Sequence, residues 1–145
     1  MSGKDWRCYV LTGLLVVATL FGRPSRASAE KASLAPAVVA AKSVFLENET
    51  GNPAVLETAK KEFGDWGRFS FAQSEDDGDL IVIFSHKFGM DVFGDVSFTV
   101  MDVYVRGVTD SPAFEAKNAV KLIWDPQRRT RVCITDFRKR LEKKN

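Results

Sequence analysis

Five consecutive apolar residues at positions 80–84 place the tightest constraint on how this 145-residue chain can fold. A strand with one solvated face alternates apolar and polar residues, and this run has no polar position. We therefore expect a central strand that is covered on both faces. Such a strand needs other strands beside it and helices across it, within a single domain.

Local patterns predict the elements that precede this strand. Residues 43–47 and 68–72 are short runs that favour β-structure. Between them, Asn52 can cap a helix that begins at Pro53, carries apolar residues at helical spacing and ends at Gly64. A strand, a helix and a second strand in this order form a right-handed crossover with parallel strands.

The rest of the chain predicts antiparallel strands. Residues 96–106 are rich in Val, Thr, Phe and Tyr, which favours one long strand. Residues 119–124 and 130–135 flank a turn and predict a hairpin, while residues 113–118 fit either a loop or a short helix. Asp136 can cap a final basic helix.

These elements predict a two-layer α+β sandwich. The expected order is β-α-β-β-β-β-β-α, in which a mixed β-sheet carries the helices on one face. The composition agrees, because 45% hydrophobic and 28% charged residues are typical of a globular protein and exclude a disordered or collagen-like chain.

The first 29 residues have the parts of a secretory signal peptide. Two basic residues precede an apolar stretch at 8–21, which is too short to span a bilayer as a helix, and small residues follow at 27–29. We expect cleavage after Ala29, a secreted or periplasmic protein, and no transmembrane span after the leader is removed. An uncleaved anchor is the alternative, because Arg23 and Arg26 lie unusually close to the cleavage site.

The exported chain is expected to hold one domain. Residues 30–41 are small and low in complexity, which predicts a flexible linker before a domain at 42–145. Cys133 is the only cysteine left after cleavage, so the hydrophobic core must hold the fold without an internal disulfide. We expect a buried Cys133 thiol, and a disulfide to a second chain is the alternative.

The charge of the exported chain argues against a nucleic-acid partner. After the leader, 17 basic and 18 acidic residues leave a net charge of −1. Eight of the bases gather in residues 128–144, where Arg138, Arg140 and Lys143 are candidates for docking on lipid headgroups or an acidic partner. The alternative is a solvated helix whose bases complement its C-terminal end.

Motifs across residues 43–135 resemble those of small secreted bacterial cell-envelope domains. A strand ends in Asn-Glu-Thr-Gly at 48–51, and after a helix the chain reaches Gly-Arg-Phe at 67–69 and an Asp-Leu strand start at 79–80. The pattern is similar to the curli-secretion lipoprotein and to the amino-terminal domain of the Tol-system propeller protein. Gly78 replaces the usual alanine. The resemblance implies an α/β fold and an envelope location, and it carries no active site.

The residue types argue against several classes of chemistry. His86 is the only histidine, and Ser85 beside it would point to the opposite face of a strand, which disfavours a Ser-His-Asp site. The acidic turn at 75–79 fails the calcium-loop pattern, because Phe84 stands where an acid is needed. We expect no catalytic residue, no metal and no cofactor.

Two features of the sequence are candidates for a functional site. Glu47 and Glu49 share one face of an extended segment and could join Asp102 in acid–base chemistry, or they could form a polar sheet edge. The second feature is a predicted loop at 87–95 with four apolar residues among its glycines. Such a loop either folds back onto the sheet, which is the commoner outcome, or contacts a partner. The four partner-binding candidates are Phe88, Met90, Val92 and Phe93.

The function expected first is that of an exported, non-enzymatic interaction or assembly domain of the bacterial cell envelope. Its partner would be a protein or an envelope surface, and its oligomeric state is open. The alternatives are a small exported hydrolase that uses carboxylates and His86, or a ligand-binding domain. A deep pocket with converging acids would favour the hydrolase, whereas an exposed apolar loop on a solid sheet would favour the interaction domain.

Overall fold

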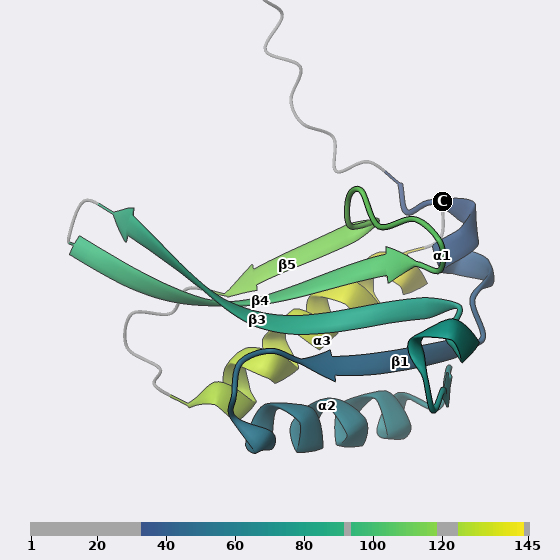
Figure 1. Cartoon of the computed structure of the whole chain (residues 1–145), viewed down its shortest axis with the longest axis horizontal. Coiled ribbons are helices and arrows are strands. Elements are labelled where there is room, and N and C mark those ends of the chain that lie inside the picture. The colour runs from purple at the N-terminus through teal and green to yellow at the C-terminus, as the bar shows by residue number, and fades with distance from the viewer. Residues whose placement is uncertain (1–32, 92–93, 119–124, 144–145) are drawn as a thin grey trace, which may run out of the picture. The chain divides into compact units, whose positions relative to one another are not determined.

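The computed structural model describes residues 33–91, 94–118 and 125–143. Along the chain these form α1 (Pro36–Ala40), β1 (Ser43–Asn48), α2 (Pro53–Trp66), β2 (Ser70–Phe71), the single 3-10 turn η1 (Glu75–Asp77), β3 (Leu80–Asp91), β4 (Gly94–Val105), β5 (Phe114–Asn118) and α3 (Pro126–Glu142). Figure 1 shows a sheet with α2 and α3 across one of its faces.

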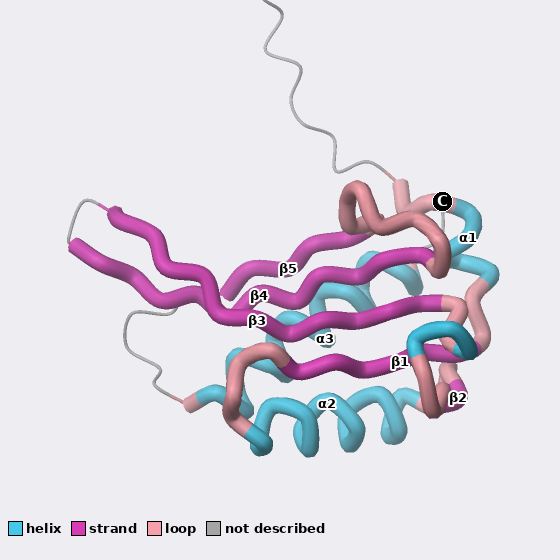
Figure 2. Tube along the Cα trace, viewed as in Figure 1, coloured by secondary structure: helices cyan, strands magenta, loops and turns pink. Residues whose placement is uncertain are grey.

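The sheet is mixed and has the strand order β2-β1-β3-β4-β5. β1 runs parallel to β2 and to β3, whereas β3 with β4 and β4 with β5 are antiparallel. α2 and α3 contact each other and pack on the same side, so the described residues form two layers (Figure 2). The α+β class, the mixed sheet and the central place of residues 80–84 are confirmed.

α2 begins as the sequence predicts and ends one turn later. The Asn52 side chain accepts a hydrogen bond from the Ala54 backbone N–H at 3.0 Å, and Pro53 lies in the first turn. The helix continues through Gly64 to Trp66. Gly67, and not Gly64, takes the left-handed conformation, with φ of 66°, and its N–H donates to the carbonyls of Phe63 and Gly64 in the last turn of the helix.

The core lies between the sheet and the helices. Its side chains come from every layer and bury apolar surface, which is the main favourable contribution to folding. Those with no more than 3% exposure include Val38, Val44, Val55, Ala59, Phe63, Leu80, Val82, Phe84, Met101, Val103, Cys133, Ile134 and Phe137.

The hairpin predicted near the C-terminus is wrong. Residues 130–135 belong to α3, and residues 119–124 lie outside the described part of the chain. Asp125 caps the helix by accepting from the Gln127 N–H at 2.9 Å, and Pro126 lies in its first turn. Asp136 is therefore inside the helix and does not begin it. These residues form a helix and not a strand, because Cys133 and its helical neighbours bury one face of the helix against the sheet.

Two further predictions are corrected. The segment predicted to be a flexible linker contains α1, whose Val38 is fully buried, so the folded unit begins before residue 42. Residues 114–118 form β5, an edge strand, and not a loop or a short helix. The predicted burial of Cys133 is confirmed, since its side chain is 1% exposed.

Candidate functional site: the β3–β4 arm

β3 and β4 extend well beyond the strands that flank them. They pair with each other from Leu80–Val105 to Asp91–Gly94. β1 pairs with residues 80–84 of β3, and β5 pairs with residues 99–103 of β4. Among the described residues, 85–91 and 94–98 therefore form a two-stranded ribbon that projects from the sheet (Figure 1), and we call this ribbon the arm.

The arm replaces the loop predicted at residues 87–95. Gly89, which reads as a loop residue in the sequence, lies within β3 opposite Val96. A Cβ at this position would approach the Phe98 ring to 2.9 Å. Glycine thus lets an aromatic ring of β4 lie against the backbone of β3.

Phe88 is the most exposed large apolar side chain among the described residues. It is 84% exposed, although Phe84, four residues earlier on the same strand, is fully buried. Phe88 therefore does not fold back onto the sheet, as most apolar loop residues do. Met90 also lies in β3, but its side chain is outside the described residues, as are Val92 and Phe93.

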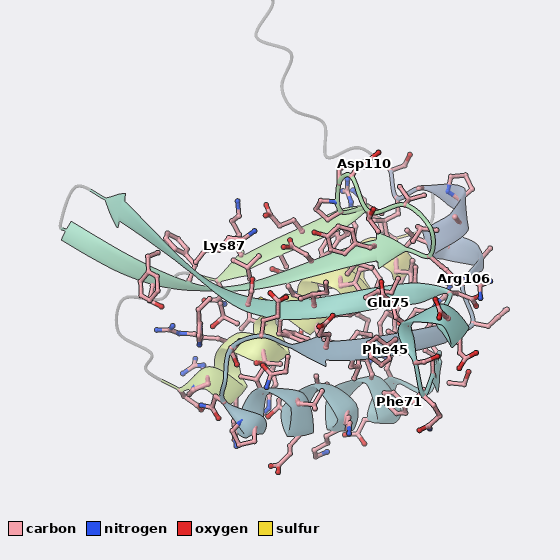
Figure 3. The ribbon with its side chains drawn as sticks, in the orientation of Figure 1. Phe45, Phe71, Glu75, Lys87, Arg106 and Asp110 are labelled. Carbon is pink, nitrogen blue, oxygen red and sulfur yellow. The ribbon has the colours of Figure 1, made fainter. Side chains whose placement is uncertain are left out.

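Carboxylates meet a lysine on the helix-free face of the sheet, near the base of the arm (Figure 3). The register sets Glu47, Ile83, Asp102 and Glu115 in one row across four strands. Lys87 Nζ lies 3.2 Å from Asp102 Oδ2 and 3.4 Å from Glu115 Oε2. Glu47 and Asp102 thus share a row, as the sequence allowed, while Glu49 follows the end of β1 and is exposed.

The electrostatics of this row favour fixed charges. The hydrogen bond that Lys87 donates to Asp102 raises the pKa of Lys87. The ammonium of Lys117, at 2.9 Å, lowers the pKa of Glu115. A carboxyl that works as a general acid needs a raised pKa, and the shift at Glu115 has the opposite direction. The arrangement suits an ion-pair network better than acid–base catalysis.

The other chemical candidates are held apart or used in the fold. His86 is exposed on β3, and Ser85 points to the other face of the strand. In the acidic turn, Asp79 Oδ2 accepts from the backbone N–H groups of Lys42 and Ser43 at 2.9 and 3.1 Å, which lowers the pKa of Asp79. Among the described residues, no group of three or more His, Cys, Asp or Glu side chains could hold a metal.

The candidate bases Arg138 and Arg140 do not share one face of α3. The Arg138 guanidinium lies 5.6 Å from the centre of the Trp66 ring and bonds Glu142 at 3.0 Å. Trp66 Nε1 donates to the same Glu142 oxygen at 2.9 Å, so Arg138 helps to join α2 to α3. Arg140 faces another direction, because two residues on a helix are about 200° apart. Lys143 is exposed at the end of α3.

Comparison with known proteins adds no assignment. No family model, curated protein or solved structure matches this chain. The likeness to envelope domains therefore stays a prediction. Within the described ranges, no helix combines the length and hydropathy needed to cross a membrane.

Proposed function

We propose that this protein is a non-enzymatic interaction domain that contacts a partner protein through the arm. The observation that carries the proposal is Phe88, which is 84% exposed on a ribbon that extends past its flanking strands. Burying a phenylalanine side chain is worth about 1.5–3 kcal/mol. A partner that covers Phe88 gains this free energy, and an aromatic anchor of this kind is typical of binding hot spots.

The backbone of the arm supports the same role. Residues 85–91 of β3 contain no proline, and their edge away from β4 has no neighbouring strand among the described residues. Unpaired backbone N–H and C=O groups on such an edge can accept an added strand. The arm thus combines an apolar anchor with a row of directional hydrogen-bonding groups.

The hydrolase alternative has less support. Its best carboxylate, Asp102, is tied to Lys87 at 3.2 Å, and His86 does not meet it, because residues 86 and 87 point to opposite faces of β3. A shallow hollow exists at the other end of β3, and Asp79 and Arg106 are the only charged residues among the described ones that line it. Alanines make up most of its remaining wall. At neither place does a described carboxylate meet His86.

We also propose that the domain works in the bacterial cell envelope after export. The support is the leader pattern of residues 1–29 and the resemblance of residues 43–135 to envelope domains. The intact mass of the native protein tests this part of the proposal. A chain that begins at Glu30 supports export, and a native chain that retains the leader contradicts it.

Capture from a native envelope extract tests the role of the arm. Immobilised Phe88→Ser protein should retain at least tenfold less partner than the wild type, a difference of about 1.4 kcal/mol. Phe71→Ser is the matched control, because Phe71 is also an exposed phenylalanine but lies in β2, at the sheet edge away from the arm. Equal capture by the Phe88→Ser and wild-type proteins would contradict the proposal, as would a wild type that captures nothing.

A further inference from the structure

The β3 strand of the arm has a sequence that complements a second copy of itself running in the opposite direction. Lys87-Phe88-Gly89-Met90-Asp91 places a cation at one end, an acid at the other, and an apolar residue on each side of a central glycine. In an antiparallel pair of two such strands, Lys87 lies opposite Asp91, Phe88 opposite Met90 and Gly89 opposite Gly89.

The hydrogen-bonding direction of β3 fits this pairing. The Phe84 carbonyl accepts from the Glu49 N–H at 2.8 Å, so the backbone groups of Phe84 face away from β4. In an antiparallel ladder this direction alternates from residue to residue, and so Phe88 and Met90 also face away from β4. No described strand pairs with them on that side.

We infer that a second copy of this chain adds to this edge as an antiparallel strand, with the two-fold axis at Gly89. Phe88 of each copy exchanges backbone hydrogen bonds with Met90 of the other, and Lys87 faces Asp91. The interface is the same patch on both copies, as a two-fold dimer requires. The inference rests on the proposed role of the arm as the contact element, and it names the partner of that element.

Neighbouring registers are poorer. A shift that sets Lys87 opposite Lys87 brings like charges together, which is destabilising in a sheet. A shift that sets Phe88 opposite Phe88 leaves Lys87 facing glycine and gains no charge pair. The outer edge of β4 at residues 94–98, which no described strand pairs, carries Asp95 as its only charge and so offers no matched pair to its own copy.

The side chains near the axis leave room for the pairing. Gly89 places no side chain at the axis, and the Phe98 ring lies against it from β4. Lys87 is 48% exposed, and its ammonium contacts Asp102 and Glu115 on the β4 side of β3. In the dimer it turns to the free edge of β3 and exchanges these contacts for Asp91 of the other copy.

The folded bodies of the two copies stay apart in this arrangement. The register separates Phe84 of one copy from Phe84 of the other by about ten residue positions along the joined ribbon. At about 3.3 Å per residue this is roughly 33 Å, with one body at each end. The contact is short compared with a standard protein interface, and so the dimer forms in a concentration-dependent equilibrium.

Sedimentation equilibrium of the native protein over a range of concentrations tests the inference. The average mass of the wild type should rise towards twice that of one chain. Asp91→Lys places two lysines opposite each other and should raise the dissociation constant at least tenfold. The double variant Lys87→Asp with Asp91→Lys restores opposite charges and should return the constant towards that of the wild type.

Asp110→Lys is the matched control, because it makes the same change on an exposed turn far from the arm (Figure 3). It should leave the dissociation constant unchanged. A dimer that Asp91→Lys and Asp110→Lys weaken equally, or that neither weakens, overturns the inferred register.

A measurement on the wild type avoids the risk that the double variant fails to fold. A mixture of nitrogen-15-labelled and unlabelled protein is treated with a carbodiimide, which joins neighbouring amines and carboxylates. Peptides that join Lys87 to Asp91 and contain both isotopes support the pairing, because they come from two chains. The absence of such mixed peptides overturns it.

The two proposals can fail separately. A wild type that stays monomeric while it still captures an envelope partner through Phe88 overturns the self-pairing and leaves the proposed function standing. A wild type that neither self-associates nor captures a partner overturns both.

Discussion

The two halves of β3 have the same backbone structure and opposite surroundings. In residues 80–84, the side chains of Leu80, Val82 and Phe84 are fully buried, and β1 and β4 flank the strand. In residues 85–91, β4 alone continues, and Phe88 is almost fully exposed. The comparison teaches that one partner strand is enough to extend a strand, whereas burial requires additional elements beside it and across it.

The arm needs support of its own, because an isolated two-stranded hairpin is marginally stable in water. Two contacts near its base and middle provide it. Lys87 reaches back to Asp102 and Glu115 on the sheet, and Phe98 packs against Gly89. The arm is therefore the part of the described structure in which local stability and global stability should differ most.

We call the described residues outside the arm the body. The largest difference in the free energy of unfolding should appear when an aromatic side chain is truncated in the body and in the arm. Phe63 is fully buried between α2 and the sheet, so Phe63→Ala should lower the free energy of unfolding by about 3–5 kcal/mol. Phe88→Ala removes an exposed ring and should change it by less than about 0.5 kcal/mol. Urea unfolding of both variants measures this, and similar losses would break the comparison.

A smaller change in the free energy of unfolding should appear at alkaline pH, because the Cys133 thiol is buried in the core. Burial, aided by the charge of Asp136, raises the pKa of the Cys133 thiol from 9.0 to about 12. Between these pH values the folded chain keeps the proton and the unfolded chain releases it. The free energy of unfolding should therefore fall as pH rises above 9, by up to about 1.4 kcal/mol for each pH unit.

Cys133→Ala provides the control for this prediction, because lysines and tyrosines titrate in both proteins. Urea unfolding at pH 8 and pH 10.5 should show that the wild type loses about 1–2 kcal/mol relative to the variant. A constant difference between the two proteins would show that the thiol is not sealed from water.

The smallest effect on global stability should come from the middle of the arm. Gly89→Ala sets a methyl group 2.9 Å from the Phe98 ring, so the ring or the strand must move. We expect faster amide hydrogen exchange in residues 85–91 and a change of less than about 0.5 kcal/mol in global unfolding. Exchange that rises equally in β1 would show that the arm and the body unfold together.

The two long helices show how far sequence patterns reach. Asn52-Pro53 and Asp125-Pro126 are equivalent start signals, and both act as caps in the structure. The second is easily missed, because β-branched residues at 130, 132, 134 and 135 favour a strand locally. Burial of one helical face against β4 and β5 overrides that preference, and this contact is invisible to a local pattern.

The candidate site was partly predictable for a related reason. The apolar residues at 88–93 indicate its position in the sequence, and the apolar residues at every second position from Phe88 to Val92 are compatible with a continuing strand. The exposure of Phe88 depends on where β1 ends, which is a non-local property. The row that joins Glu47, Asp102 and Glu115 likewise depends on the register of four strands.

The position of α3 in the chain has a consequence for synthesis. Ribosomes release β4 and β5 before the helix that covers them, so Met101, Val103 and Ala116 have no shield until Phe137 has emerged. During translation the nascent polypeptide exposes these apolar side chains to water for that interval. Chaperones that hold unfinished chains therefore have their natural binding window on this protein between the emergence of β4 and that of α3.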